Sequence, residues 1–258
     1  MIPKIIHYCW FGGKELGDFE LTCLASWKDL MPDYQIKLWD ESSLDLDRFP
    51  FAKEALKYGK YAFVSDVVRL HALHEDGGIY LDTDVLVLRS FDDLLDHSFF
   101  TGEYKAGALN AAVIGSEAGQ PILKNLLEYY ESLEFNPKKP KTIPEVFDNF
   151  LLNERIKDIK IYPPEFLYPL PLDQKEKDYS IFLTANSYCV HLWNHSWIDE
   201  FMLLKQFRFR ESFVLNFRHV IISPAVYFTY SHQTRYFKEF YLRIKMYLHQ
   251  QVYGEKKD

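Results

Sequence analysis

The sequence has 258 residues, of which 48% are hydrophobic and 26% charged, as in an ordinary globular protein. Its formal net charge of −7 argues against a general nucleic-acid-binding protein, which would carry an excess of lysine and arginine. The three cysteines form no CxxC pair, so we expect a reducing compartment rather than a disulfide framework or a zinc knuckle. The first residues are too polar for a secretory signal, and no apolar run reaches the roughly 18 residues of a membrane span. We therefore expect a cytoplasmic protein.

The first third of the chain alternates between strand-like and helix-like runs. Residues 4–11 are β-branched and aromatic and stop at Gly12-Gly13, which predicts a strand followed by a tight loop. The next runs predict a helix, a strand, two helices and a strand at residues 16–31, 34–39, 53–58, 62–75 and 79–88. This order favours an α/β protein with a mostly parallel sheet.

The rest of the chain continues this pattern and then becomes helical. We predict a strand, a helix, a loop, an extended proline-rich segment and a last strand at residues 111–114, 121–133, 136–144, 162–171 and 188–192. Helical patterns follow to the end. The sequence therefore predicts two parts, an α/β domain over residues 1–200 and a basic, aromatic helical extension over residues 201–258.

Two aspartates, Asp82 and Asp84, interrupt the apolar β-forming run at residues 79–88. Side chains two apart on a strand point to the same face, so these carboxylates would lie side by side and repel each other. A divalent cation removes this repulsion, and carboxylates with free water positions suit magnesium or manganese. A solvated strand end or a calcium-binding turn is the alternative, although Val85 follows where an EF-hand would need further oxygen ligands.

Longer segments surround this acidic motif. Residues 61–70 read YAFVSDVVRL and residues 75–84 read EDGGIYLDTD, and together they resemble the sugar-binding region of glycosyltransferase family 32. The opening segment IPKIIHYCWFG (residues 2–12) and the later segment VHLWNHSW (residues 190–197) are similar to other parts of that family. The resemblance implies a catalytic domain of the GT-A type over residues 1–200, with a Rossmann-like, mostly parallel sheet flanked by helices.

The resemblance also implies an activity. Members of the family are metal-dependent glycosyltransferases that use a nucleotide-sugar, usually with retention of anomeric configuration. We expect a UDP-sugar as donor of a hexose or N-acetylhexosamine, manganese or magnesium as cofactor, and a saccharide or lipid-linked saccharide as acceptor. The resemblance further suggests a bacterial enzyme of surface polysaccharide assembly, located in the cytoplasm or at the inner face of the membrane.

Individual residues take roles by the same resemblance. Asp84 would bind the metal directly, Asp82 would hold the ribose and the metal's water shell, and His191 would complete the coordination. The remaining donor contacts would come from His7 and Trp10 at the nucleobase, Asp66 and Arg69 at the sugar and pyrophosphate, Asn110 near the sugar, and Trp197 at the diphosphate.

Most of these residues also have an ordinary explanation. Asp66 and Arg69, three apart on a predicted helix, could form a surface ion pair of little energetic weight. Trp10 could be a core residue, and Asn110 suits a turn. His191 could share a zinc ion with the next histidine, although the strand-like pattern there breaks the helical spacing that such a pair would need.

The helical extension differs from the rest of the chain in charge. Residues 201–258 carry ten Lys/Arg against four Asp/Glu, interleaved with Phe, Tyr and Leu, whereas the first 200 residues carry 20 against 33. A basic, aromatic, amphipathic helix suits an anionic membrane surface, which would fit a lipid-linked acceptor. The alternative is a helical lid that packs its aromatic residues on the domain.

Two other functions compete with sugar transfer. A glycoside hydrolase also needs paired carboxylates, but it cleaves its substrate without a metal or a nucleotide. A non-catalytic module would bind a metal or a glycan without turnover. Binding of a nucleoside diphosphate in the presence of a metal distinguishes the transferase from both.

Overall fold

The computed structural model describes residues 1–137, 140–148, 150, 159–194, 204, 207, 209–222 and 230–253. The chain forms two compact units. The first comprises Met1–Leu56 and Tyr61–Asn194, and the second comprises Lys57–Lys60 and His195–Asp258. All the candidate site residues that the structure describes belong to the first unit.

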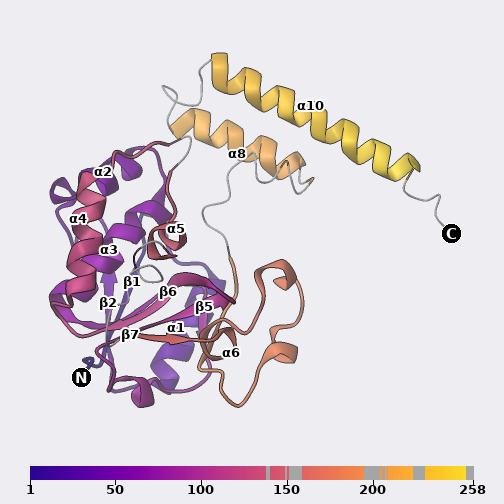
Figure 1. Ribbon diagram of the computed structural model, residues 1–258. Coiled ribbons are helices and arrows are strands. Elements are labelled where there is room, and N and C mark those ends of the chain that lie inside the picture. Colours follow the sequence, from indigo (N-terminus) through magenta and orange to yellow (C-terminus); the bar gives the residue numbers. More distant parts are fainter. Residues whose placement is uncertain are drawn as a thin grey trace. The chain divides into compact units, whose positions relative to one another are not determined.

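A six-stranded sheet forms the centre of the first unit (Figure 1). Its strand order is β2-β1-β3-β6-β5-β7, and the strands are Gln35–Trp39, Ile5–Cys9, Gly78–Leu81, Ala108–Ser116, Phe99–Lys105 and Ile159–Tyr162. The pairs β1–β2, β1–β3 and β5–β7 are parallel, whereas β6 is antiparallel to both of its neighbours. Five strands therefore run in one direction, which confirms the predicted α/β class with a mostly parallel sheet.

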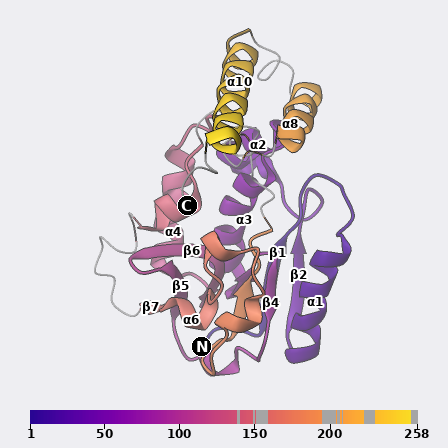
Figure 2. The ribbon, with the colours of Figure 1, turned by 90° about the vertical axis from the view of Figure 1, so that its right-hand side faces the viewer.

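Helices cover both faces of this sheet, with α3 (Tyr61–Asp76) on one face and α1 (Asp18–Leu30) on the other (Figures 1 and 2). Successive side chains of β1 point to opposite faces of the sheet, so this strand contacts the helices on both faces. The ring of Tyr8 packs edge-on against Trp27 of α1, with ring centroids 5.8 Å apart. The neighbouring His7 lies on the opposite face, where its Nε2 is 2.7 Å from the carbonyl oxygen of Gly77, directly after α3.

The sequence predicted that the acidic motif lies within one strand. In the structure it lies in a turn between two strands. Strand β3 ends at Leu81, and β4 (Val85–Val87) pairs instead with β8 (Cys189–His191) in a separate two-stranded sheet. The Val85 N–H donates to the carbonyl oxygen of Asp82 at 3.0 Å, which closes the turn. Because the chain leaves the large sheet at this point, the two aspartates meet through a tight turn and not through the two-residue repeat of a strand.

Two glycines end α3 and start β3. Gly77 has a φ of 65°, and its N–H donates to the carbonyl oxygen of Leu73 at 3.0 Å. Gly78 has a φ of 110°, and a Cβ there would lie 2.5 Å from the carbonyl oxygen of Ile5. Only glycine tolerates both the left-handed backbone and this close approach, so the pair carries the chain directly from α3 into the strand that precedes the acidic turn.

The remaining elements of the first unit lie around this framework. Further α-helices are α2 (Pro50–Lys57), α4 (Pro121–Ser132), α5 (Ile143–Phe147) and α6 (Pro164–Leu167). Short 3-10 helices are Leu46–Arg48, Asp92–Leu94, Leu172–Gln174 and Tyr179–Phe182. The helix predicted over residues 121–133 is confirmed. Strand β6 is longer than the strand predicted at 111–114, and β5 was not predicted.

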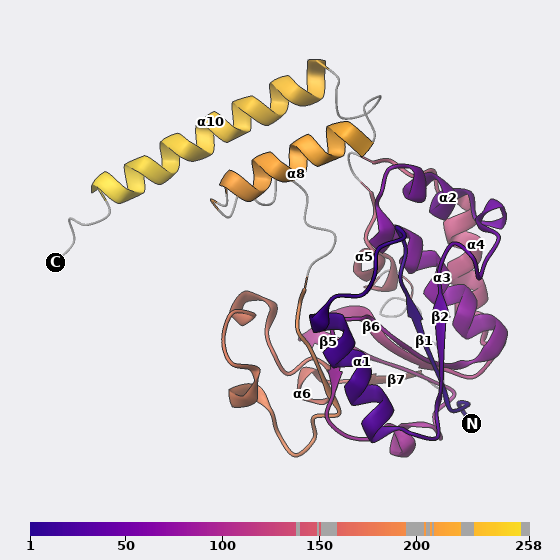
Figure 3. The same cartoon turned by 180° about the vertical axis from the view of Figure 1, so that it is seen from behind.

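The second unit contains a helical hairpin, α8 (Phe209–Ile222) and α10 (Tyr230–Tyr253), which lie side by side in Figures 1 and 3. The Ser212 and Tyr236 hydroxyls are 3.1 Å apart, and Asn216 donates to Gln233 at 3.2 Å. Later residues of α8 thus pair with earlier residues of α10, so the helices are antiparallel. The predicted helical extension is confirmed. Within the described ranges, no helix combines the length and the apolar character needed to cross a bilayer.

Candidate active site around the acidic turn

Asp82, Asp84 and His191 meet at the turn between the two sheets. One ligand atom from each of these side chains lies within 4.8 Å of the others. Strand pairing explains the meeting, because Val85 of β4 is in register with His191 of β8. The Nε2 of His191 consequently lies 3.0 Å from Oδ1 of Asp84.

Asp84 is held as an anion inside this triad. Burial is the largest influence on its carboxyl group and raises its pKa, but the charge and hydrogen bond of His191 and the N–H of Asn194 together bring the pKa below its ordinary value. The Asn194 N–H donates to Oδ2 of Asp84 at 2.8 Å. The buried Nδ1 of His191 has no hydrogen-bond partner among the described residues. Two carboxylates and an imidazole at this spacing fit a divalent cation.

Asp82 connects the triad to α3. Its Oδ1 accepts a hydrogen bond from the Tyr80 hydroxyl at 2.9 Å and lies 3.3 Å from Nη1 of Arg69. The Arg69 guanidinium lies 4.5 Å from the centre of the Tyr80 ring and also donates to the carbonyl oxygen of Ala111 at 2.7 Å. The side chain of Arg69 therefore fixes Asp82 from the interior of the domain.

Asp66 and Arg69 do not form a surface ion pair. Nη2 of Arg69 is 3.1 Å from Oδ1 of Asp66, and the two side chains are only 5% and 7% exposed, respectively. Burial raises the pKa of Asp66 to about 7, although the Arg69 charge lowers it. A buried pair of this kind costs desolvation energy, so it indicates a requirement for charge at this place more than a contribution to stability.

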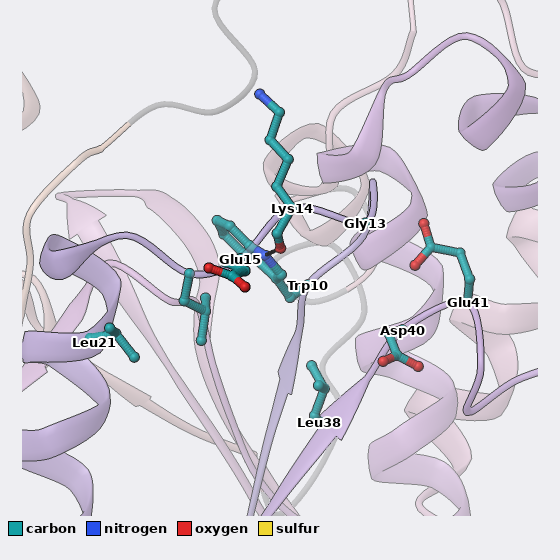
Figure 4. Close-up of a pocket in the computed structure, with 9 residues that line it drawn as sticks. Trp10, Gly13, Lys14, Glu15, Leu21, Leu38, Asp40 and Glu41 are labelled. Carbon is teal, nitrogen blue, oxygen red and sulfur yellow. Dashed lines mark hydrogen bonds between the residues drawn. The ribbon is translucent and has the colours of Figure 1, made fainter.

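Trp10 lies beside a pocket of about 540 Å³ beyond the ends of β1 and β2 (Figure 4). Its indole N–H donates to the carbonyl oxygen of Lys14 at 2.6 Å, which fixes the ring in the wall. Leu21 and Leu38 contribute apolar surface, and the pocket is further lined by Gly13, Glu15, Leu16, Asp40 and Glu41. A flat aromatic ring, aliphatic neighbours and carboxylate acceptors suit a nucleobase.

A short hydrogen-bonded link joins the pocket wall to the triad. Glu20, next to Leu21 in α1, accepts from the Asn194 side-chain amide at 3.0 Å and from the Gly17 N–H at 3.0 Å. The backbone of the same Asn194 donates to Asp84. Sequence reasoning missed this role of Glu20. Its position three residues after Gly17 suggests a helix-capping glutamate, but no local pattern identifies its distant partner.

His7 and Asn110 are both predicted to contact the donor, but their side chains have different surroundings in the structure. His7 is fully buried; its Nδ1 accepts from the Trp39 indole N–H at 3.0 Å, and its Nε2 faces Gly77. This favours a structural role for His7 over the predicted contact with a nucleobase. Asn110 lies on β6 beside Ala111, and its side-chain oxygen accepts from the Ala112 N–H at 2.8 Å. The predicted contact of Trp197 falls outside the described residues.

These features define the class of protein. An acidic turn follows the central strand β3 of a mostly parallel sheet, and a pocket of about 540 Å³ lies beyond the ends of β1 and β2, where open α/β sheets commonly bind their ligands. Residues 17–101 match the glycosyltransferase sugar-binding region that contains the DXD motif. Residues 114–206 match the conserved region of α-1,4-glycosyltransferases. Both matched regions are regions of glycosyltransferases, and the first carries the DXD motif.

Several known proteins are similar to the chain. Inositol phosphoceramide mannosyltransferase 3 of Schizosaccharomyces pombe is 32% identical over 139 residues, which cover 52% of this chain and 39% of that protein. Lactosylceramide 4-alpha-galactosyltransferase of Rattus norvegicus is 27% identical over 149 residues, which cover 51% and 40%. An uncharacterized glycosyltransferase of Acanthamoeba polyphaga mimivirus is 28% identical over 229 residues, which cover 80% and 88%. The chain thus spans about two fifths of the first two proteins and most of the third.

The fold also matches a solved structure. The PaToxG glycosyltransferase superposes with a TM-score of 0.50 at 22% identity, covering 60% of this chain and 69% of that one. The agreement extends the sequence match to the three-dimensional arrangement and supports the predicted GT-A architecture.

Proposed function

We propose that this protein is a metal-dependent glycosyltransferase that moves a sugar from a nucleotide-sugar to a saccharide or lipid-linked saccharide. The observation that carries the proposal is the convergence of Asp82, Asp84 and His191 at one turn. The two matched regions, both of glycosyltransferases, favour sugar transfer, and the triad would supply the cation-binding groups that such a transfer from a diphosphate requires.

The three residues of the triad would contact a cation in different ways. Asp84 and His191 would bind manganese or magnesium directly, since their ligand atoms already face each other. Asp82, fixed by Tyr80 and Arg69, would hold the water shell of the ion and the donor ribose. When bound, the cation neutralises the charge that develops on the leaving diphosphate. Burial of Asp84 and His191 strengthens this effect, because water screens charges less there.

The donor would extend from the triad to the Trp10 pocket. We assign the nucleobase to this pocket, with Trp10 as the stacking surface, and we keep UDP as the expected carrier. Arg69 already contacts four protein acceptors, so we assign it and Asp66 to positioning Asp82 instead of the predicted direct contact with pyrophosphate. Asn110 is the amide near the expected sugar position, and Trp197 remains the predicted cover of the diphosphate.

The acceptor follows from the names of the relatives. Two of them act on ceramide-based glycolipids, as their names state, which favours a lipid-linked saccharide over a free one. Retention of anomeric configuration is the outcome that the family resemblance implies. The matching proteins come from organisms as different as a yeast, a mammal, a virus and a bacterium, so bacterial origin and a role in surface polysaccharide assembly rest on the resemblance alone.

Thermal unfolding with a panel of nucleoside diphosphates, with and without manganese, tests this proposal. A ligand at about 100 times its dissociation constant stabilises the native state by about 2.7 kcal/mol. We expect a manganese-dependent increase in Tm with one nucleotide, lost in Asp84→Ala and kept in the control Asp93→Ala, an exposed aspartate outside the triad. Stabilisation by manganese alone would favour a binding module, and cleavage of glycans without metal or nucleotide would favour a hydrolase.

A further inference from the structure

Helix α10 carries two distinct apolar stripes. The first faces α8: Phe240 and Tyr247 lie with their ring centroids 5.6 and 5.9 Å from that of Phe209, and the Tyr236 hydroxyl meets Ser212. Tyr236 is fully buried by this packing.

Among the described residues, the second stripe makes no ring contact with α8, and Phe237 contacts only the neighbouring Tyr236 ring of the same helix. It consists of Phe237, Tyr241, Ile244 and Leu248, spaced i, i+4, i+7 and i+11, so these side chains share one face of the helix. Phe237, Tyr241 and Leu248 are 52%, 67% and 55% exposed. The face lies roughly 90° around the helix from the first stripe, from about 100° per residue. Large apolar side chains in water are unfavourable, so this stripe indicates a surface that is covered when the protein acts.

Positive charge borders the exposed stripe. Lys238 and Lys245 each follow a stripe residue by one position, lie seven residues apart and are exposed. No ion pair among the described residues involves either lysine. Across residues 233–248 the single acidic residue is Glu239, which already bonds Arg243 at 2.7 Å. The combination of apolar side chains and unneutralised lysines on one side is the pattern of an interfacial helix.

The other helix of the hairpin contributes in the same way. Phe213, Val214 and Phe217 of α8 are 50%, 60% and 61% exposed. Ser212 and Asn216, on the other side of this helix, are buried against α10. Each helix therefore contacts the other helix of the hairpin through one side and has large, exposed apolar residues on another side.

We propose that the α8–α10 hairpin docks the enzyme on an anionic lipid surface. Phe237, Tyr241 and Leu248 enter the boundary between head groups and acyl chains, while Lys238 and Lys245 contact lipid phosphates. Charge complementarity favours this occupant, because an anionic lipid surface presents negative head groups directly above an apolar layer and so matches both the lysines and the apolar stripe. Docking places the enzyme where a lipid-linked acceptor is found, a consequence that rests on the proposed function, whereas lipid binding itself does not.

Co-sedimentation of the full chain with vesicles tests this inference. We expect binding to phosphatidylcholine vesicles that contain phosphatidylglycerol, little binding to phosphatidylcholine alone, and a decrease with ionic strength. Removing two lysines at about 1 kcal/mol each lowers the partition coefficient about 30-fold, so Lys238→Gln/Lys245→Gln should bind about 30-fold more weakly. Phe237→Ser should bind more than tenfold more weakly, because a buried phenylalanine contributes about 2 kcal/mol.

Matched variants separate docking from misfolding. Lys28→Gln/Lys105→Gln removes the same charge from two exposed positions of the first unit and should bind as the wild type does. All variants should retain the circular dichroism spectrum and the nucleotide-dependent increase in Tm. Equal binding of wild type and hairpin variants, or absence of wild-type binding to anionic vesicles, would overturn the inference. So would a dimer by light scattering that Phe237→Ser converts to a monomer, since the stripe would then pair two copies.

Discussion

The imidazole of His191 lies 3.0 Å from the carboxylate of Asp84, although β4 and β8 come from distant parts of the chain. We predict that His191→Ala weakens manganese binding at least tenfold, because one nitrogen ligand is lost while both carboxylates stay. Calorimetric titration with manganese measures this directly. His97→Ala, which removes a half-buried histidine outside the triad, is the control. Unchanged affinity in His191→Ala would remove this residue from the metal site.

Arg69 should be essential to the fold as well as to the site. Arg69→Met leaves Asp66 without its buried partner and Asp82 without its fixing contact, so we expect a loss of about 3–5 kcal/mol in the free energy of unfolding. Urea unfolding measures it. The double variant Arg69→Met/Asp66→Asn should recover part of the loss, because it replaces the carboxyl group that has lost its buried partner. If the loss in the double variant equals the sum of the losses in Arg69→Met and Asp66→Asn measured separately, the pair is not coupled.

The pH dependence of stability should reveal Asp66. Burial raises its pKa to about 7 in the folded protein, from an ordinary value of 3.8. The folded state thus holds this proton more tightly than the unfolded state, so this residue lowers stability as pH rises from about 4 to 7, and the loss is complete above 7. Asp66→Asn cannot lose a proton. We therefore expect its stability relative to the wild type to increase over this window, measured by urea unfolding at several pH values. A constant difference between the two proteins would show that Asp66 ionises normally.

Trp10 should matter for the nucleotide and not for the metal. Trp10→Ala removes the proposed stacking surface, and stacking on an aromatic side chain contributes about 1–3 kcal/mol per base. We expect roughly tenfold to hundredfold weaker binding of the nucleoside diphosphate, with manganese binding unchanged in its absence. Trp10→Phe should keep much of the affinity because an aromatic face remains. Equal nucleotide affinity in Trp10→Ala and the wild type would place the base elsewhere.

Much of the fold follows from local patterns in the sequence. The strand at residues 4–11, the helices at 62–75 and 121–133 and the last strand at 188–192 all correspond to observed elements. The first three also have a glycine or proline at a boundary. The split at Asp82–Asp84 was not predictable in the same way. The residues on both sides favour strands equally, and only pairing with the distant β8 takes Val85 into a second sheet.

The site was predictable where a residue belongs to a contiguous motif. Asp82, Asp84 and His191 were expected from such motifs, and the structure brings them together. The burial of Asp66 and Arg69, the enclosure of His7 and the contact between Glu20 and Asn194 depend on packing between elements that are far apart in the sequence. The short pattern around each of these residues is equally compatible with a surface position.

The contact between Glu20 and Asn194 has a thermodynamic consequence. One carboxylate caps the helix that borders the Trp10 pocket and also holds the segment whose backbone binds Asp84. A ligand that orders either end of this link lowers the entropy cost of ordering the other. Nucleotide and cation should therefore bind with positive cooperativity, and the factor by which each strengthens the other must be the same. The enzyme would then assemble its donor complex as a unit, selecting the nucleotide-sugar that arrives with its cation over either component alone.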